Sequence, residues 1–150
     1  MGINRVAVIL LVEDDAGDQE LIQRALLNCT IKNDLHVVKD GEEALDYLYR
    51  RGRYAEGQGY SMPDLILLDL NLPRFDGRQF LSRIKGDPKL RRIPAVVLTT
   101  SQQEKDIVQS YDAGANAYVI KPATVEQIMK LVNVLVTYWF DVVQLPSLEN

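Results

Sequence analysis

Residues 65–73 read Leu-Ile-Leu-Leu-Asp-Leu-Asn-Leu-Pro, and this stretch decides the class of fold. Its first four residues are all apolar, which is typical of a strand buried on both faces, as in a parallel sheet between two helix layers. The apolar run ends at Asp69, and a Leu-Pro turn follows instead of the start of a helix. Asp69 is therefore expected at the carboxyl end of a buried strand, where open α/β sheets bind their ligands.

Apolar runs of this kind recur along the chain, and each is followed by a segment of helical period. We expect strands at residues 6–12, 35–38, 65–68, 95–98 and 117–120, and helices at residues 16–28, 42–50, 77–85, 102–113 and 124–143. Strand and helix alternate five times, which predicts an α/β domain of doubly wound (βα)5 architecture. The irregular stretch 51–62, which contains three glycines, is expected to be a mobile surface insertion.

Size and charge exclude several classes of protein. The 150 residues fit one domain, and the net charge of −4, without a long block of either sign, disfavours direct binding to nucleic acid. No apolar run approaches the ~18 residues of a membrane span, and the run 6–12 leads into Glu13 instead of a signal-cleavage site. A cytoplasmic protein is expected, and its single cysteine, Cys29, cannot form an internal disulfide.

Polar side chains follow four of the expected strands at their carboxyl ends. They are Glu13, Asp14 and Asp15 after the first strand, Asp69 after the third, Thr99 and Thr100 after the fourth, and Lys121 after the fifth. A single Asp after a strand is usually a helix N-cap, which we would expect of Asp14 or Asp15 alone. Helix capping does not explain acids and a lysine from several strands at one edge.

Carboxylates crowded at one edge repel one another unless a cation lies between them. A hard divalent ion such as Mg²⁺ suits these oxygen ligands, and Lys121 adds a second positive charge for an anion. This set of groups supports phosphoryl transfer to a carboxylate, which requires positioning and cations more than a base. The one histidine, His36, is expected to be a surface or strand residue without a functional role.

Four segments together resemble the receiver domain of two-component response regulators. They are Ile9-Leu10-Leu11-Val12-Glu13-Asp14, Leu67-Leu68-Asp69-Leu70-Asn71-Leu72-Pro73, Val97-Leu98-Thr99, and Tyr118 to Lys121-Pro122. The intervals also match, with thirty positions from Asp69 to Thr99 and twenty-two from Thr99 to Lys121. The resemblance covers about residues 5–138. It implies a flavodoxin-like fold with strand order 2-1-3-4-5, a single receiver domain over 1–150 with a helical tail at about 139–150, and no output domain.

The resemblance also assigns roles by position. It implies that Asp69 is phosphorylated, that Mg²⁺ is bound directly by Asp14, Asp69 and the Asn71 carbonyl, and that Glu13 binds it through water. Lys121 would neutralise the phosphoryl group, Thr99 would donate a hydrogen bond to it, and Thr99 with Tyr118 would form the switch. The chain departs from the family at Glu13, where Asp is usual, and at Thr100, where Ala is common. The bulk of Thr100 is expected to hinder entry to Asp69.

Within this family, the chain looks similar to small stand-alone regulators that accompany cyanobacterial phytochrome kinases. The features that carry this resemblance are the stretch 67–73, Arg-Arg-Ile-Pro at 91–94, the long loop 51–62, Tyr138-Trp139-Phe140 and Leu145-Pro146. They imply a phytochrome-type sensor histidine kinase as partner and a role in switching protein–protein interactions. The only catalysis implied is of its own phosphorylation and dephosphorylation.

Two other classes of protein also place phosphate chemistry on such a sheet. Haloacid-dehalogenase-type phosphatases use an Asp nucleophile with Mg²⁺, but a second Asp two residues later acts as acid and base. Here Asn71 occupies that position and cannot take a proton from water, so the acyl phosphate should persist. A flavodoxin-like nucleotide carrier would have its phosphate loop where Glu13, Asp14 and Asp15 repel phosphate.

The final helix carries more apolar surface than packing on one sheet requires. Its packing stripe is expected to be Val125, Ile128, Met129, Val132, Val136, Trp139 and Val143, and its polar side Glu126, Lys130, Asn133, Thr137, Asp141 and Gln144. Four further apolar residues extend the apolar surface: Leu131, Val134, Tyr138 and Val142. The expected helix at 102–113 and the tail Leu145-Pro146 are an alternative cover for them, but a peripheral helix has few neighbours. The sequence therefore predicts a symmetric homodimer through the last helix, with the helix at 102–113 and the strand at 117–120.

Overall fold

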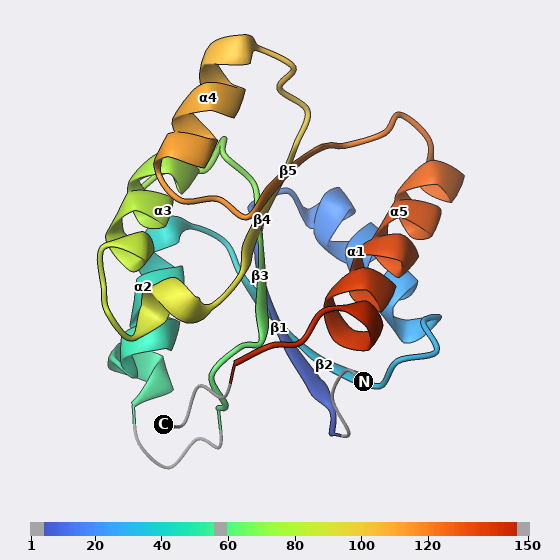
Figure 1. The fold of residues 1–150 in the computed structure, drawn as a ribbon, viewed down its shortest axis with the longest axis horizontal. Coiled ribbons are helices and arrows are strands. Elements are labelled where there is room, and N and C mark those ends of the chain that lie inside the picture. The colour runs from blue at the N-terminus through green and yellow to red at the C-terminus, as the bar shows by residue number, and fades with distance from the viewer. Residues whose placement is uncertain (1–4, 56–59, 147–150) are drawn as a thin grey trace.

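The computed structural model describes residues 5–55 and 60–146, in which one parallel sheet lies between two helix layers (Figure 1). The strands are β1 (Ala7–Val12), β2 (Asn33–Val38), β3 (Leu65–Leu68), β4 (Ala95–Thr99) and β5 (Ala117–Ile120), in the order β2-β1-β3-β4-β5. The α-helices are α1 (Ala16–Leu27), α2 (Gly41–Tyr49), α3 (Gly77–Lys85), α4 (Glu104–Asp112) and α5 (Val125–Thr137). The predicted doubly wound fold and its strand order are confirmed.

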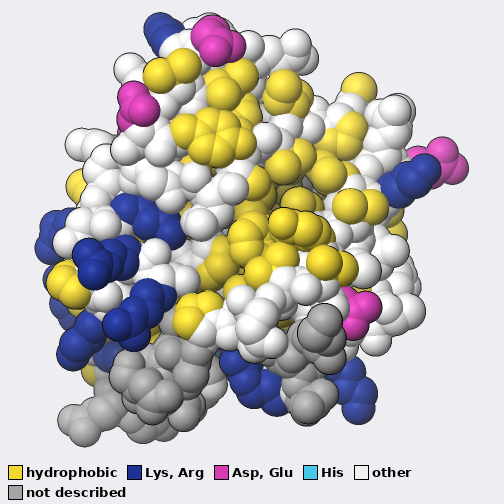
Figure 2. Space-filling view, in the orientation of Figure 1, with side chains coloured by type: hydrophobic (Ala, Val, Ile, Leu, Met, Phe, Trp, Pro, Cys, Tyr) yellow, Lys and Arg dark blue, Asp and Glu magenta, His cyan; other side chains and the backbone are white. Residues whose placement is uncertain are grey.

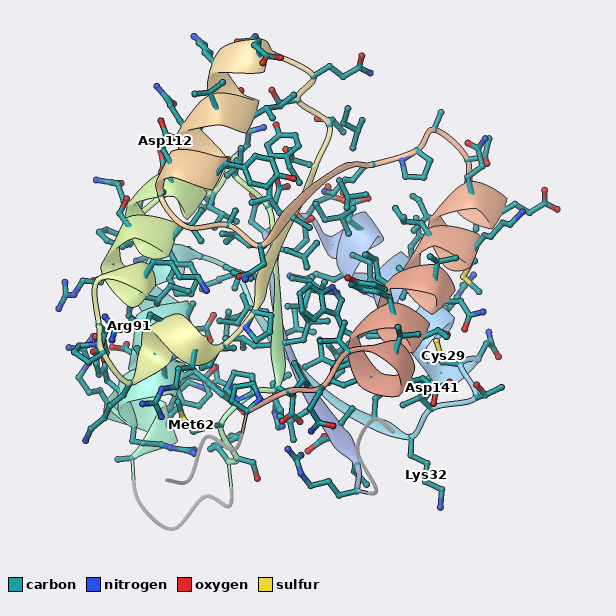
Figure 3. The ribbon with its side chains drawn as sticks, viewed as in Figure 1. Cys29, Lys32, Met62, Arg91, Asp112 and Asp141 are labelled. Carbon is teal, nitrogen blue, oxygen red and sulfur yellow. The ribbon has the colours of Figure 1, made fainter. Side chains whose placement is uncertain are left out.

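Successive strand residues point to opposite faces of the sheet, which explains why whole strands are apolar. Leu10 and Val12 of β1 belong to a core beneath α2 and α3, whereas Ile9 and Leu11 belong to a core beneath α1 and α5. Figure 1 shows α2, α3 and α4 on one side of the sheet and α1 and α5 on the other. Two labelled side chains in Figure 3 mark the two sides: Met62 packs against the first core and Cys29 against the second.

Short polar side chains set the starts of most helices. Asp15, Asp40 and Thr124 each accept a hydrogen bond from a backbone N–H in the first turn of α1, α2 and α5. Asp76 caps α3 with a full capping box that involves Gln79. The N-cap role considered for Asp15 is thus confirmed. Because these caps lie at the carboxyl edge of the sheet, they also fix the loops that carry the polar cluster.

The described ends of the loop 51–62, which we expected to be a mobile surface insertion, pack against the domain. The loop contains a 3₁₀ turn, η1 (Gly52–Tyr54), and the Tyr54 side chain is buried. Tyr47, Tyr54 and Tyr60 form edge-to-face ring contacts with centroids 5.1–5.6 Å apart, and His36 of β2 packs against two of these rings. The described ends of the loop are therefore anchored by aromatic packing; residues 56–59 lie outside the described part of the chain.

The last helix changes its winding after Thr137. The α-helix gives way to a π-helical turn, η3 (Tyr138–Val142), whose wider ring shifts the side chains away from a projection at 100° per residue. Two residues absent from the predicted stripe are buried, Leu135 before this turn and Phe140 within it, and so are the predicted Val132 and Val136. Val125 is 53% exposed, so its assignment to the stripe is wrong. It begins the helix, and burial starts one turn later.

A second 3₁₀ turn, η2 (Leu90–Arg92), leads into β4. After α4, Gly114 lies just past the end of the helix with a φ of +107°, a conformation that favours glycine. A Cβ there would lie 2.7 Å from Cγ of Lys85, so this close approach also needs glycine. Within the described ranges 5–55 and 60–146, no helix is both long and apolar enough to span a membrane.

Candidate functional site

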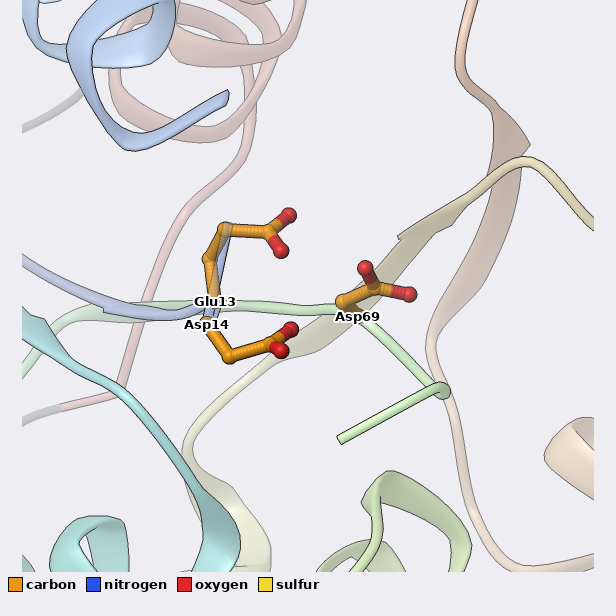
Figure 4. A group of neighbouring side chains, drawn as sticks. All are labelled: Glu13, Asp14 and Asp69. Atoms are coloured by element: carbon orange, nitrogen blue, oxygen red, sulfur yellow. The ribbon is translucent and has the colours of Figure 1, made fainter. Parts of the chain in front are cut away.

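The carboxylates of Glu13, Asp14 and Asp69 meet at the carboxyl edge of the sheet (Figure 4). Strands β1 and β3 are neighbours with Val12 opposite Leu68, so the residues that follow them are brought together. Each of the three side chains offers one oxygen, and these oxygens lie within 4.8 Å of one another. Glu13 is buried, Asp69 is nearly so, and Asp14 is exposed. Three converging hard oxygens form a donor set that fits a divalent cation such as Mg²⁺.

Lys121 enters this cluster from β5. Its backbone N–H donates to the carbonyl of Thr99 over 2.7 Å, which holds the residue beside the end of β4. Its ammonium group lies 2.6 Å from Oε1 of Glu13, 2.7 Å from Oδ2 of Asp18 and 3.1 Å from Oδ2 of Asp69. Because only 8% of the Lys121 side chain is exposed, one positive charge is held against three acids with little competition from water.

The electrostatics of the cluster follow from this crowding. Burial raises the pKa of Glu13 to about 7; the hydrogen bond from Lys121 opposes this shift and the charge of Asp69 adds to it. Burial alone would lower the pKa of Lys121, but its contacts with Asp18 and Glu13 hold it well above the usual value. Lys121 is therefore charged near neutral pH, and the acids still outnumber the cations, which favours binding of a further positive ion.

Thr99 lies at the end of β4 and is fully buried. Among the described residues, its Oγ1 is a buried side-chain oxygen without a hydrogen-bond partner. Buried hydroxyl groups are usually paired, so an orphaned one beside an acidic cluster is suited to a ligand oxygen. Thr100 is exposed; its expected effect on entry to Asp69 remains a prediction.

The loop after Asp69 is held in place from several sides. The backbone N–H of Asn71 donates to Oδ1 of Asp69 over 3.2 Å, and that of Gly77 donates to the carbonyl of Leu70 over 3.1 Å. A Cβ on Gly77 would lie 2.5 Å from the carbonyl oxygen of Asp69, so this position requires glycine. The expected role of the Asn71 carbonyl as a metal ligand remains a prediction.

The same loop is tied to the start of α2. Arg74 forms an ion pair with the buried Asp40, and the Gly41 N–H donates to the carbonyl of Phe75 over 3.1 Å. The cap of α3 at Asp76 holds the other end of the loop. The segment behind Asp69 is consequently anchored to two helices.

Sequence reasoning did not identify Asp18. This residue lies in the first turn of α1, and it returns to the cluster because the helix starts directly after the acids of β1. Its spacing of one helical turn from Asp14 and Asp15 was the available signal. Tyr118, predicted as a switch residue, is partly buried, and its hydroxyl donates to the carbonyl of Ser101 over 2.9 Å.

Comparison with known proteins gives the family. Residues 9–133 match the response regulator receiver domain. The chain belongs to this family. It is 42% identical over 144 residues to the response regulator Rcp1 of Synechocystis sp., with 96% of each chain covered. It is therefore a response regulator of two-component signalling and a regulatory phospho-acceptor.

Solved structures of related response regulators superpose closely on this receiver domain. The phosphorylated cyanobacterial phytochrome response regulator RcpA is 48% identical, with a TM-score of 0.89 and coverage of 95% of this chain and 100% of its own. The Mn²⁺-bound form of Rcp1 is 42% identical, with a TM-score of 0.86 and coverage of 94% and 99%. The acidic cluster of this chain thus lies in a fold for which a metal-bound relative is known.

The receiver domain also carries an apolar surface across α4, β5 and α5, which we call the 4-5-5 surface (Figure 2). Its exposed apolar residues are Val108, Tyr111, Ile120, Val134, Tyr138 and Val142. Three of the four residues predicted for an interface on the last helix are thus exposed. Leu131 is the exception: it is partly buried and lines a small apolar cavity against α1 with Leu21 and Ile128. It packs between helices because α5 lies against α1.

Proposed function

We propose that Asp69 accepts a phosphoryl group from a phytochrome-type sensor histidine kinase. The observation that carries the assignment is the position of its carboxylate between the Lys121 ammonium, 3.1 Å away, and the oxygens of Glu13 and Asp14. The similarity to phytochrome response regulators supports the choice of kinase. Transfer from such a kinase would take place in the cytoplasm, where we place the protein.

Each side chain of the cluster has a distinct task in this proposal. Asp69 supplies the attacking oxygen, and Lys121 neutralises charge on the transferred group. Glu13, Asp14, Asp69 and the Asn71 carbonyl would hold Mg²⁺, with Glu13 acting through water. When bound, this ion would supply positive charge for the phosphoryl oxygens. The Thr99 hydroxyl, unpartnered in the structure, would donate a hydrogen bond to a phosphoryl oxygen.

The side chain of Asn71 favours persistence of the acyl phosphate over its rapid hydrolysis. An amide cannot accept a proton from water, so a phosphatase reaction lacks its base at this position. Turnover of a phosphate monoester by the purified protein would contradict this reasoning.

The acceptor assignment can be tested with a small donor. The protein is incubated with acetyl phosphate and Mg²⁺, and the modified peptide is identified by mass and by its lability to base. We expect one phosphoryl group on Asp69, none on Asp69→Asn, and normal uptake by the control Asp46→Asn, which removes the carboxylate of the Asp46–Arg51 ion pair away from the cluster. Equal uptake by Asp69→Asn would refute the assignment.

The kinase assignment needs a separate comparison. Transfer from a phytochrome-type histidine kinase is measured beside transfer from an unrelated histidine kinase at equal concentrations. We expect faster transfer from the phytochrome-type enzyme. Equal rates would remove the support for that partner while leaving the acceptor assignment intact.

We further propose that the 4-5-5 surface forms a symmetric homodimer. Val134 and Tyr138 are 57% and 51% exposed, and contiguous apolar surface of this kind is typical of an interface. Sedimentation should show a dimer for the wild type and a folded monomer for Val134→Glu combined with Tyr138→Glu. Leu27→Glu, at an 83% exposed residue of α1, is the control and should remain dimeric. A wild-type monomer at high micromolar concentration, with or without phosphorylation, would refute this proposal.

A further inference from the structure

Asp18 contacts the Lys121 ammonium but has no part in the acceptor chemistry proposed above. The ammonium group has three N–H donors, and in the structure each of them faces one acid. The distances from Nζ to Glu13 and Asp18 are 2.6 and 2.7 Å, whereas the distance to Asp69 is 3.1 Å. Lys121 is therefore held mainly by the two acids beside the acceptor, and less tightly by the acceptor itself.

The three acids around Lys121 differ in what else they are suited to bind. Glu13 and Asp69 belong to the group of oxygens that fits a divalent cation, and Asp18 lies outside that group. The charge of Glu13 and Asp69 would thus be shared between Lys121 and a bound cation. Asp69 is in addition the proposed site of phosphorylation. Asp18 is consequently the one acid of the three that neither the cation nor the phosphoryl group would engage.

The backbone of Asp18 is held in the first turn of α1. Its N–H donates to Oδ2 of Asp15 over 2.8 Å, and the side chain of the next residue, Gln19, donates to the carbonyl of Glu13 over 2.6 Å. Both hydrogen bonds tie the start of the helix to the segment that follows β1. Asp18 therefore approaches Lys121 from a fixed position.

On another side, Lys121 faces apolar residues. Lys121 and Asp18 both line the small cavity between α1 and α5, and its other six lining residues are Leu21, Ile22, Leu98, Pro122, Ile128 and Leu131. A buried ammonium group without a hydrogen-bond acceptor is strongly disfavoured. None of these six side chains offers Lys121 an acceptor that could replace Asp18.

Asp18 has two opposite effects on the transfer of a phosphoryl group to Asp69. Its negative charge repels an anionic donor, but its side chain is 30% exposed, and water and salt weaken such repulsion. Its hydrogen bond restricts the ammonium group of Lys121, which is carried on a flexible four-carbon stem. A misplacement of about 1 Å in an active site can lower a rate by about a hundredfold. We therefore expect the effect on position to exceed the effect of charge.

We propose that Asp18 is a positioning residue that holds the Lys121 ammonium beside Asp69, both with and without a divalent cation at the acidic cluster. We further infer that phosphorylation of Asp69 requires the hydrogen bond from Lys121 to Asp18 more than it requires the charge of Asp18. The second statement rests on the proposed function of Asp69, whereas the first does not.

The first experiment measures hydrogen exchange between the Lys121 ammonium group and water by NMR. The unphosphorylated protein carries ¹⁵N in its lysine side chains, the Lys121 signal is assigned with Lys121→Arg, and spectra are recorded without and with Mg²⁺. Asp18→Ala should raise the exchange rate at least about tenfold in both conditions, the factor expected for loss of a hydrogen bond between charged groups. Asp18→Asn keeps an oxygen acceptor and should raise it at most about threefold. Unchanged exchange in Asp18→Ala would overturn the first statement, as would an effect that disappears on adding Mg²⁺.

The matched control is Glu20→Gln, which also removes one acid from α1. Glu20 is 66% exposed and pairs with Arg24 over 3.1 Å, so this variant should leave the Lys121 signal unchanged. Exchange raised as much by Glu20→Gln as by Asp18→Ala would indicate a general effect of charge and overturn the proposal. We expect Asp18→Ala to fold, because alanine favours helices and the N–H that binds Asp15 is retained.

The second experiment measures the rate of phosphorylation by acetyl phosphate at saturating Mg²⁺. Asp18→Ala should lower the maximum rate at Asp69 at least about tenfold, whereas Asp18→Asn should stay within about threefold of the wild type and Glu20→Gln should match it. An unchanged or higher rate in Asp18→Ala would overturn the second statement, and so would equal losses in Asp18→Ala and Asp18→Asn. If wild-type Asp69 takes up no phosphoryl group, the proposed function fails, and hydrogen exchange at Lys121 still decides the first statement.

Discussion

Replacing Thr99 by Val should stabilise the unphosphorylated protein and impair its phosphorylation. The Thr99 hydroxyl is fully buried and has no partner. A buried polar group without a hydrogen bond lowers stability by about 1–3 kcal/mol. Valine has nearly the same shape and replaces the hydroxyl by a methyl group, so we expect the free energy of unfolding to rise by about 1–2 kcal/mol. In a chain of this size, each 1 kcal/mol raises Tm by about 2–4 °C.

The opposite effect is expected once Asp69 carries a phosphoryl group. A hydrogen bond to a charged group contributes about 1.5–3 kcal/mol, which corresponds to a factor of about ten to one hundred in an equilibrium. Thr99→Val should therefore lower the phosphorylated fraction reached with a small donor by up to that factor. A gain in stability with a loss in phosphorylation is the combination expected of a site kept unsatisfied for its ligand.

Urea unfolding without divalent cations, followed by far-UV circular dichroism, measures the first effect. Thr124→Val is the matched control, because the Thr124 hydroxyl accepts a hydrogen bond from the N–H of Gln127 as the cap of α5. That variant should lose about 1 kcal/mol. If Thr99→Val lost stability as the control does, the hydroxyl would have a partner and the reasoning would be wrong.

Three further outcomes follow from burial and charge. Lys121→Met should lower the free energy of unfolding in urea by about 2–4 kcal/mol, because it leaves three acids without their ammonium partner. Adding Mg²⁺ should restore part of this loss. An unchanged free energy of unfolding would contradict the described charge balance. Phe140→Ala should lower the free energy of unfolding by about 3–5 kcal/mol in the same assay because the ring is 2% exposed, whereas Tyr138→Ala should cost far less. Equal losses would contradict the described difference in burial. Burial raises the pKa of Tyr47 from 10 to about 12. The neutral phenol therefore stabilises the fold below pH 10. This contribution, up to about 2.7 kcal/mol, is lost as the pH rises toward 12. Stability should thus fall less steeply above pH 10 in Tyr47→Phe, and parallel curves would refute this.

The sequence allowed the fold and most of the cluster to be predicted because both depend on the strands. Buried parallel strands are apolar throughout, and topology brings their carboxyl ends to one edge regardless of the details of the loops. Glu13, Asp69 and Lys121 directly follow strands and Thr99 ends one, so their positions were predictable.

Features that depend on helical faces and loops were harder to predict from the sequence. Asp18 and Asp106 lie on helices, and their partners come from elements distant in the chain. The π-helical turn has no sequence signal, and Phe140 within it is buried although the predicted stripe left it out. The aromatic contacts of Tyr54 and Tyr60 depend on the path of a loop that turn propensities do not determine.

The anchored loop behind Asp69 makes the two sides of the acidic cluster different, because this loop is bonded to α2 and α3. Three contacts hold this side of the domain in place: the hydrogen bond from the Gly41 N–H to the Phe75 carbonyl, the ion pair of Arg74 with Asp40, and the helix cap at Asp76. If Asp69 is phosphorylated as proposed, these contacts oppose a displacement from the carboxyl edge toward α2. The displacement would then be transmitted through β4 toward β5 and α4. Redirecting it toward α2 would require weakening the contacts of the anchored loop.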